Sequence, residues 1–489
     1  MQNNDFQTFS RAPRGRVFWL CAGLLSLVSV AQAAPNEERP PNVVLIFADD
    51  LGWRDVGFMG SDYYRTPHLD RLARQGMTFT DAYANAPNCA PTRACLMSGQ
   101  YTPRHGVYTV GTSARGPAHL RKLVPTPNET VLDEEIVTLA ESFHKAGYAT
   151  ASMGKWHLGP DPRTQGFDIN VAGSNDGSPR GGYFSPYRIP NIEDGPEGEY
   201  VTDRLADEAL HFIEQHVDEP FFLYLPHFAV HTPIQAKPEL TEKYQDQPAS
   251  HGQHHPAYAA MIESLDESVG RIMARLDELK LADETVVIFC SDNGGHGVVT
   301  SNQPLRGWKG MLYEGGIRVP LVVRWPGKVE AGSRSETPVI TSDFYPTLLE
   351  ITGATAPEQP LDGESLLPLL TEQGQLQRTA LYWHFPAYLE ANRGAKDPWR
   401  TTPAGAIREG DWKLIEYFED GRLELYNLAD DLSEGNNLAQ SMPERTQQLH
   451  QKLKQWRRAI DAPVPSERNP KYNPQAKPQR KKSKKENSK

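Results

Sequence analysis

Residues 42–50 read Asn42-Val-Val-Leu-Ile-Phe-Ala48-Asp49-Asp50, and this stretch decides the fold. From Val43 to Ala48 the side chains are β-branched, aliphatic or aromatic, which is typical of a strand buried on both faces of a sheet. The run is also too short for a buried helix. Asp49 and Asp50 therefore follow a central strand directly, at the sheet edge where open α/β proteins bind their ligands.

Short apolar runs alternate with longer amphipathic ones through residues 34–375, where we expect one large domain. This alternation predicts an α/β fold in which a large, mostly parallel sheet is flanked by helices. Helical spacing of apolar residues predicts helices within 136–143 and 261–276. Further strands are expected at 148–153, 220–225, 285–290 and 321–325.

The pattern changes near residue 375, and we expect a smaller C-terminal α+β subdomain at 376–462. Its antiparallel strands are predicted at 406–408, 412–417 and 423–426, with Asp420-Gly421 as a turn. A helix should close the subdomain from Ser441, because Glu444 three residues later completes the pattern of a capping box.

The N-terminal residues should belong to neither domain. Arg11, Arg14 and Arg16 precede an apolar run that ends in Ala-Gln-Ala at 31–33, which is the order of a cleaved signal peptide, placed at residues 1–33. A membrane anchor is the alternative, but the run is short for a span. We therefore expect an exported protein, periplasmic or secreted, with no membrane span in the mature chain.

The formal net charge is −11, and basic residues gather in the last segment, 463–489. Its lysines, prolines, asparagines and serines predict a basic disordered tail. The tail either keeps the protein soluble or holds it near a polyanion, and no nucleic-acid partner is expected. Because the rest of the chain is acidic, a site for an anionic substrate needs positive charge concentrated locally.

Removal of the signal peptide leaves Cys89, Cys95 and Cys290, an odd number for an oxidising compartment. Cys89 opens the segment Cys89-Ala-Pro-Thr-Arg93, in which it is either a buried structural thiol before a proline-stiffened turn or a residue with chemistry. Cys95 and Cys290 are either free buried thiols or bonded to each other.

A second acidic pair, Asp292-Asn293, directly follows the strand expected at 285–290. Each pair alone could merely cap a helix or begin a loop. Two oxygen-rich pairs at the carboxyl ends of strands can instead converge on one hard cation, and oxygen ligands favour calcium or magnesium over zinc.

Basic and imidazole side chains also follow predicted strands. Lys155 and His157 are two residues apart after the strand at 148–153, so both can project to the same side. His231 follows the strand at 220–225. Lys309 lies between glycines, which allow close approach to a ligand.

Together these segments resemble the formylglycine-dependent sulfatases of the alkaline phosphatase superfamily. The segment Cys89–Arg93 is similar to the signature at which sulfatases convert cysteine into formylglycine, and the order of segments from Asp49 to Arg318 matches throughout. Residues 406–415 and 424–438 are similar to the small C-terminal domain of bacterial carbohydrate sulfatases. Thr92 departs from the pattern, because serine or alanine is more usual there.

The resemblance implies that Cys89 becomes formylglycine through a formylglycine-generating maturation enzyme. It implies one divalent cation, Ca²⁺ with Mg²⁺ as the alternative. Its implied ligands are Asp49, Asp50, the modified Cys89, Asp292 and Asn293. Bound to them, the cation would lower the pKa of one hydroxyl of the hydrated aldehyde, which attacks sulfur.

The resemblance also implies roles for the basic residues. Lys155, Lys309 and Arg93 would neutralise the sulfate oxygens and the nucleophile. His231 would protonate the leaving oxygen, and His157 would take a proton from the second hydroxyl, which expels sulfate and restores the aldehyde.

The implied substrate is a sulfated polysaccharide or an oligosaccharide derived from it. Candidate residues for its binding are Asn175 and Arg180 in a glycine-rich loop and His384 in an aromatic cluster. Two alternatives stay open: a phosphonate monoester or phosphodiester hydrolase of the same superfamily, and a protein that only binds sulfated glycans through an unmodified Cys89.

Overall fold

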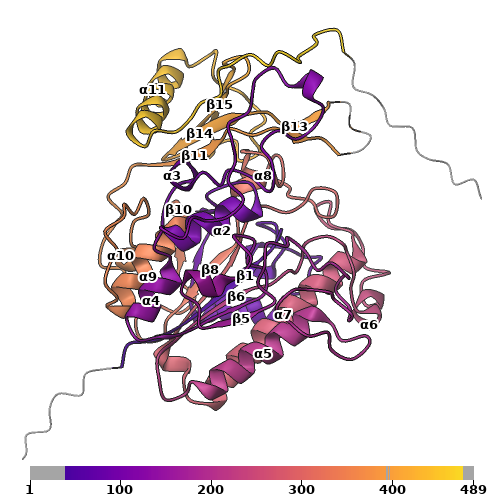
Figure 1. Ribbon diagram of the computed structural model, residues 1–489, viewed down its shortest axis with the longest axis vertical. Coiled ribbons are helices and arrows are strands. Elements are labelled where there is room, and N and C mark those ends of the chain that lie inside the picture. Colours follow the sequence, from indigo (N-terminus) through magenta and orange to yellow (C-terminus); the bar gives the residue numbers. More distant parts are fainter. Residues whose placement is uncertain (1–38, 393–394, 396, 477–489) are drawn as a thin grey trace, which may run out of the picture. The chain divides into compact units, whose positions relative to one another are not determined.

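The predicted central strand is β1 (Asn42–Ala48), and it lies in the middle of a large sheet (Figure 1). The computed structural model describes residues 39–392, 395 and 397–476, and within them this sheet has eight strands. In spatial order they are β5 (Ile169–Val171), β4 (Ala149–Met153), β6 (Phe221–Pro226), β1, β7 (Thr285–Ser291), β8 (Leu321–Arg324), β2 (Met77–Phe79) and β9 (Arg334–Ser335).

The strands on either side of β1 run parallel to it, so the mostly parallel sheet is confirmed. Val44 is in register with Leu223 of β6 and Val287 of β7. The strand β4 is parallel to β6, whereas β8 is antiparallel to β7. The carboxyl ends of β1, β4, β6 and β7 therefore share one edge of the sheet.

Helices cover both faces of this sheet, as expected. Val44 and Ile46 of β1 pack into one core with α1 (Pro67–Gln75), α5 (Val201–Gln215) and α7 (Pro256–Glu278), and Figure 1 shows α5 and α7 side by side. Val43 and Leu45 point the other way and pack with α2 (Cys89–Ser98), α4 (Leu139–Lys145) and α9 (Phe344–Thr352). This alternation explains why β1 is apolar at every position from Val43 onward.

The helices of the described residues are α1 (Pro67–Gln75), α2 (Cys89–Ser98), α3 (Thr102–His105), α4 (Leu139–Lys145), α5 (Val201–Gln215), α6 (Pro238–Glu242), α7 (Pro256–Glu278), α8 (Glu314–Ile317), α9 (Phe344–Thr352), α10 (Leu367–Leu370) and α11 (Pro443–Ala459). Short 3₁₀ helices occur at Gly57–Met59, Ala118–Leu120, Pro162–Gln165, Ala282–Glu284 and Thr341–Asp343. A small two-stranded sheet joins β3 (Ala82–Tyr83) to β10 (Val339–Ile340).

The smaller subdomain contains the predicted antiparallel strands and one more. Its described residues form a four-stranded sheet in the order β11 (Ala380–Phe385), β14 (Ala404–Glu409), β15 (Trp412–Tyr417) and β16 (Leu423–Asn427). A separate hairpin pairs β12 (Leu389–Glu390) with β13 (Trp399–Thr401). Leu449 and Leu453 of α11 pack on Ile407 and Leu414 of the four-stranded sheet.

The predicted capping box at Ser441 is wrong. The helix α11 begins at Pro443, and the hydroxyl of Ser441 donates instead to the carbonyl of Leu438, at 3.2 Å. A proline in the first turn fixes the backbone there without a side-chain cap.

The prediction of a disordered tail from residue 463 is wrong for its first part. Arg468 and Asn469 form backbone bridges to the loop at 118–124, and the amide of Asn473 donates to the carbonyl of His119 at 2.9 Å. The predicted signal peptide at 1–33 and residues 477–489 lie outside the described residues.

The described part of the chain contains no helix with the length and apolar character needed to cross a membrane. Its cysteines, Cys89, Cys95 and Cys290, are all buried thiols without a disulfide bond. Of the two possibilities for Cys95 and Cys290, the structure therefore has free thiols, and the Cys95 sulfur lies 3.3 Å from Nε2 of His105.

Candidate active site

The two acidic pairs meet at the carboxyl edge of the sheet, because β1 and β7 are adjacent. The amide of Asp50 donates to Oδ1 of Asp292 at 3.1 Å, and the side-chain amide of Asn293 donates to Oδ1 of Asp50 at 2.8 Å. All four side chains, including that of Asp49, are buried. Asp50 has a φ of 63°, and the hydroxyl of Tyr258 donates to its carbonyl at 3.2 Å.

Two lysines lie on these carboxylates. Nζ of Lys155, just after β4, is 2.6 Å from Oδ2 of Asp49. Nζ of Lys309 is 2.6 Å from Oδ1 of Asp50 and also donates to Sγ of Cys89 at 3.2 Å. The lysine at 309 therefore connects the cysteine to the acidic cluster.

Cys89 is the first residue of α2, and the rest of its segment fixes that helix in place. The hydroxyl of Thr92 donates to the carbonyl of Ala86 at 3.0 Å and accepts its amide at 3.2 Å. One turn into the helix, Arg93 donates to Oδ2 of Asp292 at 2.8 Å and to the carbonyl of Lys155 at 2.7 Å. Thr92 thus secures the start of the helix, and Arg93 ties the helix to two strand ends.

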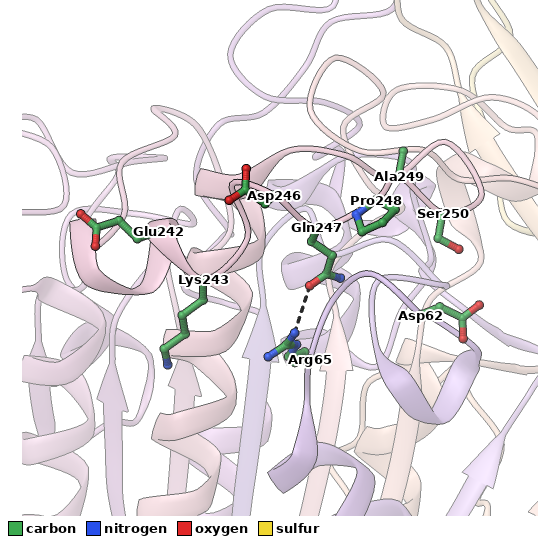
Figure 2. A pocket seen from close by; sticks show the side chains of 9 residues that line it. All are labelled: Asp62, Arg65, Glu242, Lys243, Asp246, Gln247, Pro248, Ala249 and Ser250. Carbon is green, nitrogen blue, oxygen red and sulfur yellow. Dashed lines mark hydrogen bonds between the residues drawn. The ribbon is translucent and has the colours of Figure 1, made fainter.

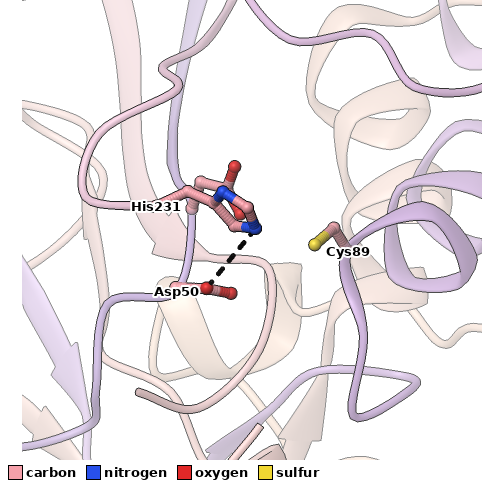
Figure 3. Close-up of side chains that lie close together, drawn as sticks. Asp50, Cys89 and His231 are labelled. Atoms are coloured by element: carbon pink, nitrogen blue, oxygen red, sulfur yellow. Dashed lines mark ion pairs between the residues drawn. The ribbon is translucent and has the colours of Figure 1, made fainter. Parts of the chain in front are cut away.

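Two histidines border the cluster from other loops. Nε2 of His231 is 3.7 Å from Oδ2 of Asp50, and Figure 3 shows the ring above that carboxylate, with the sulfur of Cys89 to the right of both. His157 has a φ of 64°, and its buried Nδ1 has no partner among the described residues. The structure therefore brings every predicted catalytic residue to one place.

Burial and charge together set the protonation of these groups. Burial raises the pKa of the Cys89 thiol to about 12, although Lys155 and Lys309 oppose the shift. Burial, followed by Lys309, lowers the pKa of His231 to about 3. Burial raises the pKa of Asp50, but Lys309 and His231 outweigh it and hold that pKa below its ordinary value. An unmodified Cys89 is therefore a neutral thiol near pH 7.

The residues fit a hard divalent cation. Oδ1 of Asp49, Oδ2 of Asp50 and Oδ1 of Asn293 are buried oxygens without a hydrogen-bond partner among the described residues. Ligand atoms of Asp49, Asp50, Cys89 and His231 all lie within 4.8 Å of one another. Buried oxygens that lack donors are costly unless a cation or a donor satisfies them.

The three predicted sugar-binding residues do not lie together: His384 is buried, whereas Asn175 and Arg180 are exposed on a loop. His384 is 2% exposed, and Nε2 of its ring lies 2.9 Å from the carbonyl of Pro463. The prediction that it lines a substrate pocket is therefore wrong, because it is packed beneath the ordered first part of the tail. Asn175 is exposed, and Arg180 pairs with Asp176 at 2.7 Å on the same loop. That loop contacts the site, since a Cβ on Gly177 would lie 2.9 Å from the His157 ring.

Sequence analysis did not identify Asp55, whose hydrogen bonds fix the backbone that follows Asp50. Its carboxylate accepts the amide of Gly52 at 2.9 Å and the hydroxyls of Tyr258 and Thr300 at 2.8 Å. Tyr258 is the residue that also holds the carbonyl of Asp50. The position of Asp55 five residues after Asp50 was the available signal, but its partners come from distant segments.

A separate pocket of about 580 Å³ opens elsewhere on the protein, as Figure 2 shows. Nη2 of Arg65 donates to Oε1 of Gln247 across it at 3.3 Å. Its lining residues are Asp62, Arg65, Glu242, Lys243, Asp246, Gln247, Pro248, Ala249 and Ser250. None of the predicted catalytic residues lines it.

Known proteins match the chain over most of its length. The family model described as sulfatase matches residues 41–354, and the model described as N-sulphoglucosamine sulphohydrolase, C-terminal, matches residues 306–459. A sulfatase from Formosa agariphila is 36% identical over 90% of this chain and 92% of its own length. Arylsulfatase A of Homo sapiens is 32% identical, over 91% of this chain and 90% of its own.

A solved structure supports the same relationship. The crystal structure of Ps i-CgsB in complex with k-i-k-neocarrahexaose is 30% identical and superimposes with a TM-score of 0.72, over 88% of this chain and 95% of that chain. The resemblance seen in the sequence motifs is thus confirmed by the full-length comparisons. The chain belongs to the sulfatase family, the sulfuric ester hydrolases of the alkaline phosphatase superfamily.

Proposed function

We propose that this sulfatase removes sulfate from a sulfated polysaccharide or its oligosaccharides, with formylglycine formed from Cys89 as its nucleophile. The observation that carries the proposal is the environment of Cys89. The thiol is 1% exposed, its pKa is raised to about 12 by burial, and an ammonium lies 3.2 Å from it. A neutral thiol is a poor nucleophile, whereas a hydrated aldehyde at this position presents two hydroxyls to the same charged cluster.

We propose that Asp49, Asp50, Asp292 and Asn293 hold one divalent cation beside residue 89, Ca²⁺ rather than Mg²⁺. The unpaired oxygens at this edge of the sheet support the assignment. A bound cation would supply positive charge for the sulfate oxygens and lower the pKa of the attacking hydroxyl. Lys155 and Lys309, each 2.6 Å from a carboxylate of the cluster, place further positive charge at the same point.

Arg93 holds these groups in position. All three of its guanidinium nitrogens donate to Asp292 or to the carbonyl of Lys155, and its side chain is fully buried. The geometry therefore supports a positioning role for Arg93 rather than the direct sulfate contact that the family resemblance implied.

We propose that His231 donates the proton that the leaving sugar oxygen needs when the sulfur–oxygen bond breaks. With no anion bound, burial and Lys309 keep His231 neutral near pH 7. A bound sulfate ester carries negative charge and favours the protonated ring. His157 is the candidate base that accepts a proton from the second hydroxyl, so that the bond between carbon 89 and the sulfate oxygen breaks and the aldehyde returns.

The relatives support a carbohydrate substrate, because one solved relative is described in complex with k-i-k-neocarrahexaose. The signal-like sequence at 1–33 supports export of the protein. Export would bring the enzyme to polysaccharides outside the cytoplasm. We retain 34–375 as the catalytic domain and 376–462 as the C-terminal subdomain, since the proposed boundary falls just before β11 at Ala380.

The test compares protein produced with and without a formylglycine-generating enzyme. Mass spectrometry of the peptide containing Cys89 should show the aldehyde only in the first sample. Only that sample should release sulfate from 4-nitrophenyl sulfate, and 4-nitrophenyl phosphate or phosphonate should turn over more slowly. Equal sulfate release from the unmodified thiol, or a preference for phosphorus esters, would refute the proposal.

A further inference from the structure

The hairpin β12–β13 places Arg400 directly on the loop that carries Lys309. Nη1 of Arg400 donates to the carbonyl of Lys309 at 3.3 Å. Gly310 has a φ of 90°, and a Cβ there would lie 2.7 Å from Cδ1 of Leu389 and 2.9 Å from Cδ of Arg400, so both the backbone and the hairpin favour glycine. The guanidinium carbon is 5.0 Å from the ring centroid of Trp308. Arg400 therefore contacts three consecutive residues of the catalytic loop.

Arg400 differs from the other cations of the site because no carboxylate of the described residues forms an ion pair with it. Each of the other cations faces a carboxylate within 2.8 Å, namely Lys155 on Asp49, Lys309 on Asp50 and Arg93 on Asp292. Among the described residues, no carboxylate lies within ion-pair distance of Arg400. Its Nη2 donates only to the amide oxygen of Asn392 at 2.8 Å, and its buried Nε has no partner.

The charged side chains next to Arg400 do not supply the missing negative charge. Arg115 forms a paired hydrogen bond with Glu390, at 3.0 and 3.1 Å, so this carboxylate of the hairpin is already engaged by another arginine. The other described carboxylate of the hairpin, Asp397, accepts the amide of Trp399 at 2.8 Å. Burial and then Arg115 lower the pKa of Arg400, while Glu390 and Asp50 oppose the shift. A guanidinium stays protonated under all of these conditions. The group Arg115, Glu390 and Arg400 thus carries one uncompensated positive charge beside the site.

A half-buried, unpaired cation is unfavourable unless a ligand satisfies it. In a chain whose formal net charge is −11, its position next to Lys309 is best explained by an anion that arrives with the substrate. Arginine presents a planar fork that matches sulfate and carboxylate groups alike.

We propose that Arg400, supported by Trp308, forms a subsite for a second anionic group of the saccharide, a sulfate or a carboxylate, while the scissile sulfate lies at residue 89. The inference rests on the proposed function and narrows its substrate class to saccharides with at least two anionic groups. Arg400 would then select substrates by charge, without taking part in bond cleavage.

The experiment uses matured full-length protein, the variants R400Q and R400K, and R71Q as a matched control. Arg71 lies on α1, is 58% exposed and pairs with Asp277 at 3.6 Å, away from every site residue. Three saccharides that share the same scissile sulfated sugar are compared: one with no other charge, one with a second sulfate and one with a uronate carboxylate. Thermal unfolding checks that each variant is folded.

We expect the wild type to have a kcat/KM at least about tenfold higher for a doubly anionic saccharide than for the singly charged one, in line with a charged hydrogen bond. In R400Q this preference should disappear, mainly through KM, and R400K should retain part of it. Loss of preference for the disulfated substrate alone identifies sulfate as the ligand, and loss for the uronate alone identifies carboxylate.

A uniform fall in kcat for all three saccharides in R400Q would overturn the proposal, because Arg400 would then only position Lys309. An unchanged preference in R400Q would also overturn it. If the wild type releases no sulfate at all, the proposed function fails, and calorimetric titration with the same saccharides still decides the subsite. R400Q should then lose affinity for the doubly anionic saccharides about tenfold more than for the singly charged one.

Discussion

Nζ of Lys309 lies 3.2 Å from Sγ of Cys89, although 220 positions separate the two residues in the sequence. The same ammonium is 2.6 Å from Asp50, so one side chain links the start of α2 to the end of β1. Arg400 of the C-terminal subdomain in turn contacts the loop that carries Lys309, and Glu434 accepts the amide of Glu314 at the start of the helix that follows. Cys89, the acidic cluster and the small subdomain are therefore connected through one loop.

Replacement of Cys89 by serine should stop turnover after one sulfation event. A serine hydroxyl can accept the sulfuryl group, but it has no second hydroxyl whose proton could be removed to expel sulfate. We expect sulfate release to fall on the order of a thousandfold or more, with a sulfated peptide visible by mass spectrometry. Cys89→Ala is the matched control, and it should show neither turnover nor adduct. Multiple turnovers by the serine variant would contradict the two-hydroxyl requirement.

Chelation should remove both activity and stability. If the unpaired oxygens of Asp49, Asp50 and Asn293 hold a cation, EDTA followed by dialysis should abolish sulfate release, and Ca²⁺ should restore it. Ca²⁺ at a hundred times its Kd should add about 2.7 kcal/mol to the free energy of unfolding. The Tm of Asp49→Asn should respond much less to Ca²⁺. A calcium-independent Tm in the wild type would argue against this site.

Lys413→Met should destabilise the protein by about 3–5 kcal/mol, because it leaves buried charge without a partner. Nζ of Lys413 lies 2.8 Å from Glu314 and 2.9 Å from Glu434, and all three side chains are fully buried. Burial already raises the pKa of Glu434 to about 7, although Lys413 opposes the shift. Urea denaturation measures the loss.

The Lys413 variant needs two comparisons. Lys452→Met removes an exposed ion pair with Glu409 and should change stability by less than about 1 kcal/mol. The double variant Lys413→Met with Glu434→Gln should recover part of the lost stability, since one uncompensated carboxylate is removed. Equal effects of the two lysine variants would show that the buried cluster does not stabilise the domain contact.

Two truncations should separate the ordered and the outermost parts of the C-terminal segment. A chain that ends after Ala476 keeps the backbone bonds of Glu467, Asn469 and Asn473 to the loop at 119–124. Its Tm and its turnover of 4-nitrophenyl sulfate should match those of the full chain. A chain that ends after Pro465 loses these bonds and should unfold several degrees lower. Identical Tm values for both truncations would mean that residues 466–476 contribute nothing to stability.

Acid should destabilise the fold through three buried histidines. Burial lowers the pKa of His105 and His227 to about 3 and that of His384 to about 4, from an ordinary value of 6.5. Between about pH 6.5 and 4 the unfolded chain binds more protons than the folded one, so stability falls as the pH falls.

Each of these histidines should contribute a slope of up to about 1.4 kcal/mol per pH unit in that window. Urea titrations from pH 7.5 to 4.5 should show the decline, and His227→Gln should make it shallower by about one proton. Parallel pH curves for the variant and the wild type would show that His227 is protonated in the folded protein or does not titrate on unfolding.

The local features of the sequence predicted much of the site. Asp49, Lys155, His231 and Asp292 could be placed because each follows an apolar strand, and parallel strands bring their carboxyl ends to one edge. The subdomain contacts could not be predicted in this way. Arg400 lies on a three-residue strand, and only the folded chain shows that it rests on the Lys309 loop.

The errors have a related origin. His384 lies in an aromatic cluster that fits a sugar pocket equally well, but β11 joins the C-terminal sheet and Pro463 covers the ring. The composition of the tail suggested disorder, yet Asn469 uses its backbone and side chain to bond the loop at 118–122. Long-range pairing overrode local composition in both places.

The burial of residue 89 also bears on when its side chain could be modified, relative to folding. Its side chain is 1% exposed, and it sits on a helix whose residues are all buried. If Cys89 is oxidised as proposed, a second protein would have to reach its sulfur before the surrounding residues pack around it, on a nascent or unfolded chain. Under the proposed function, a molecule that folds before this step would have the native fold and no sulfatase activity.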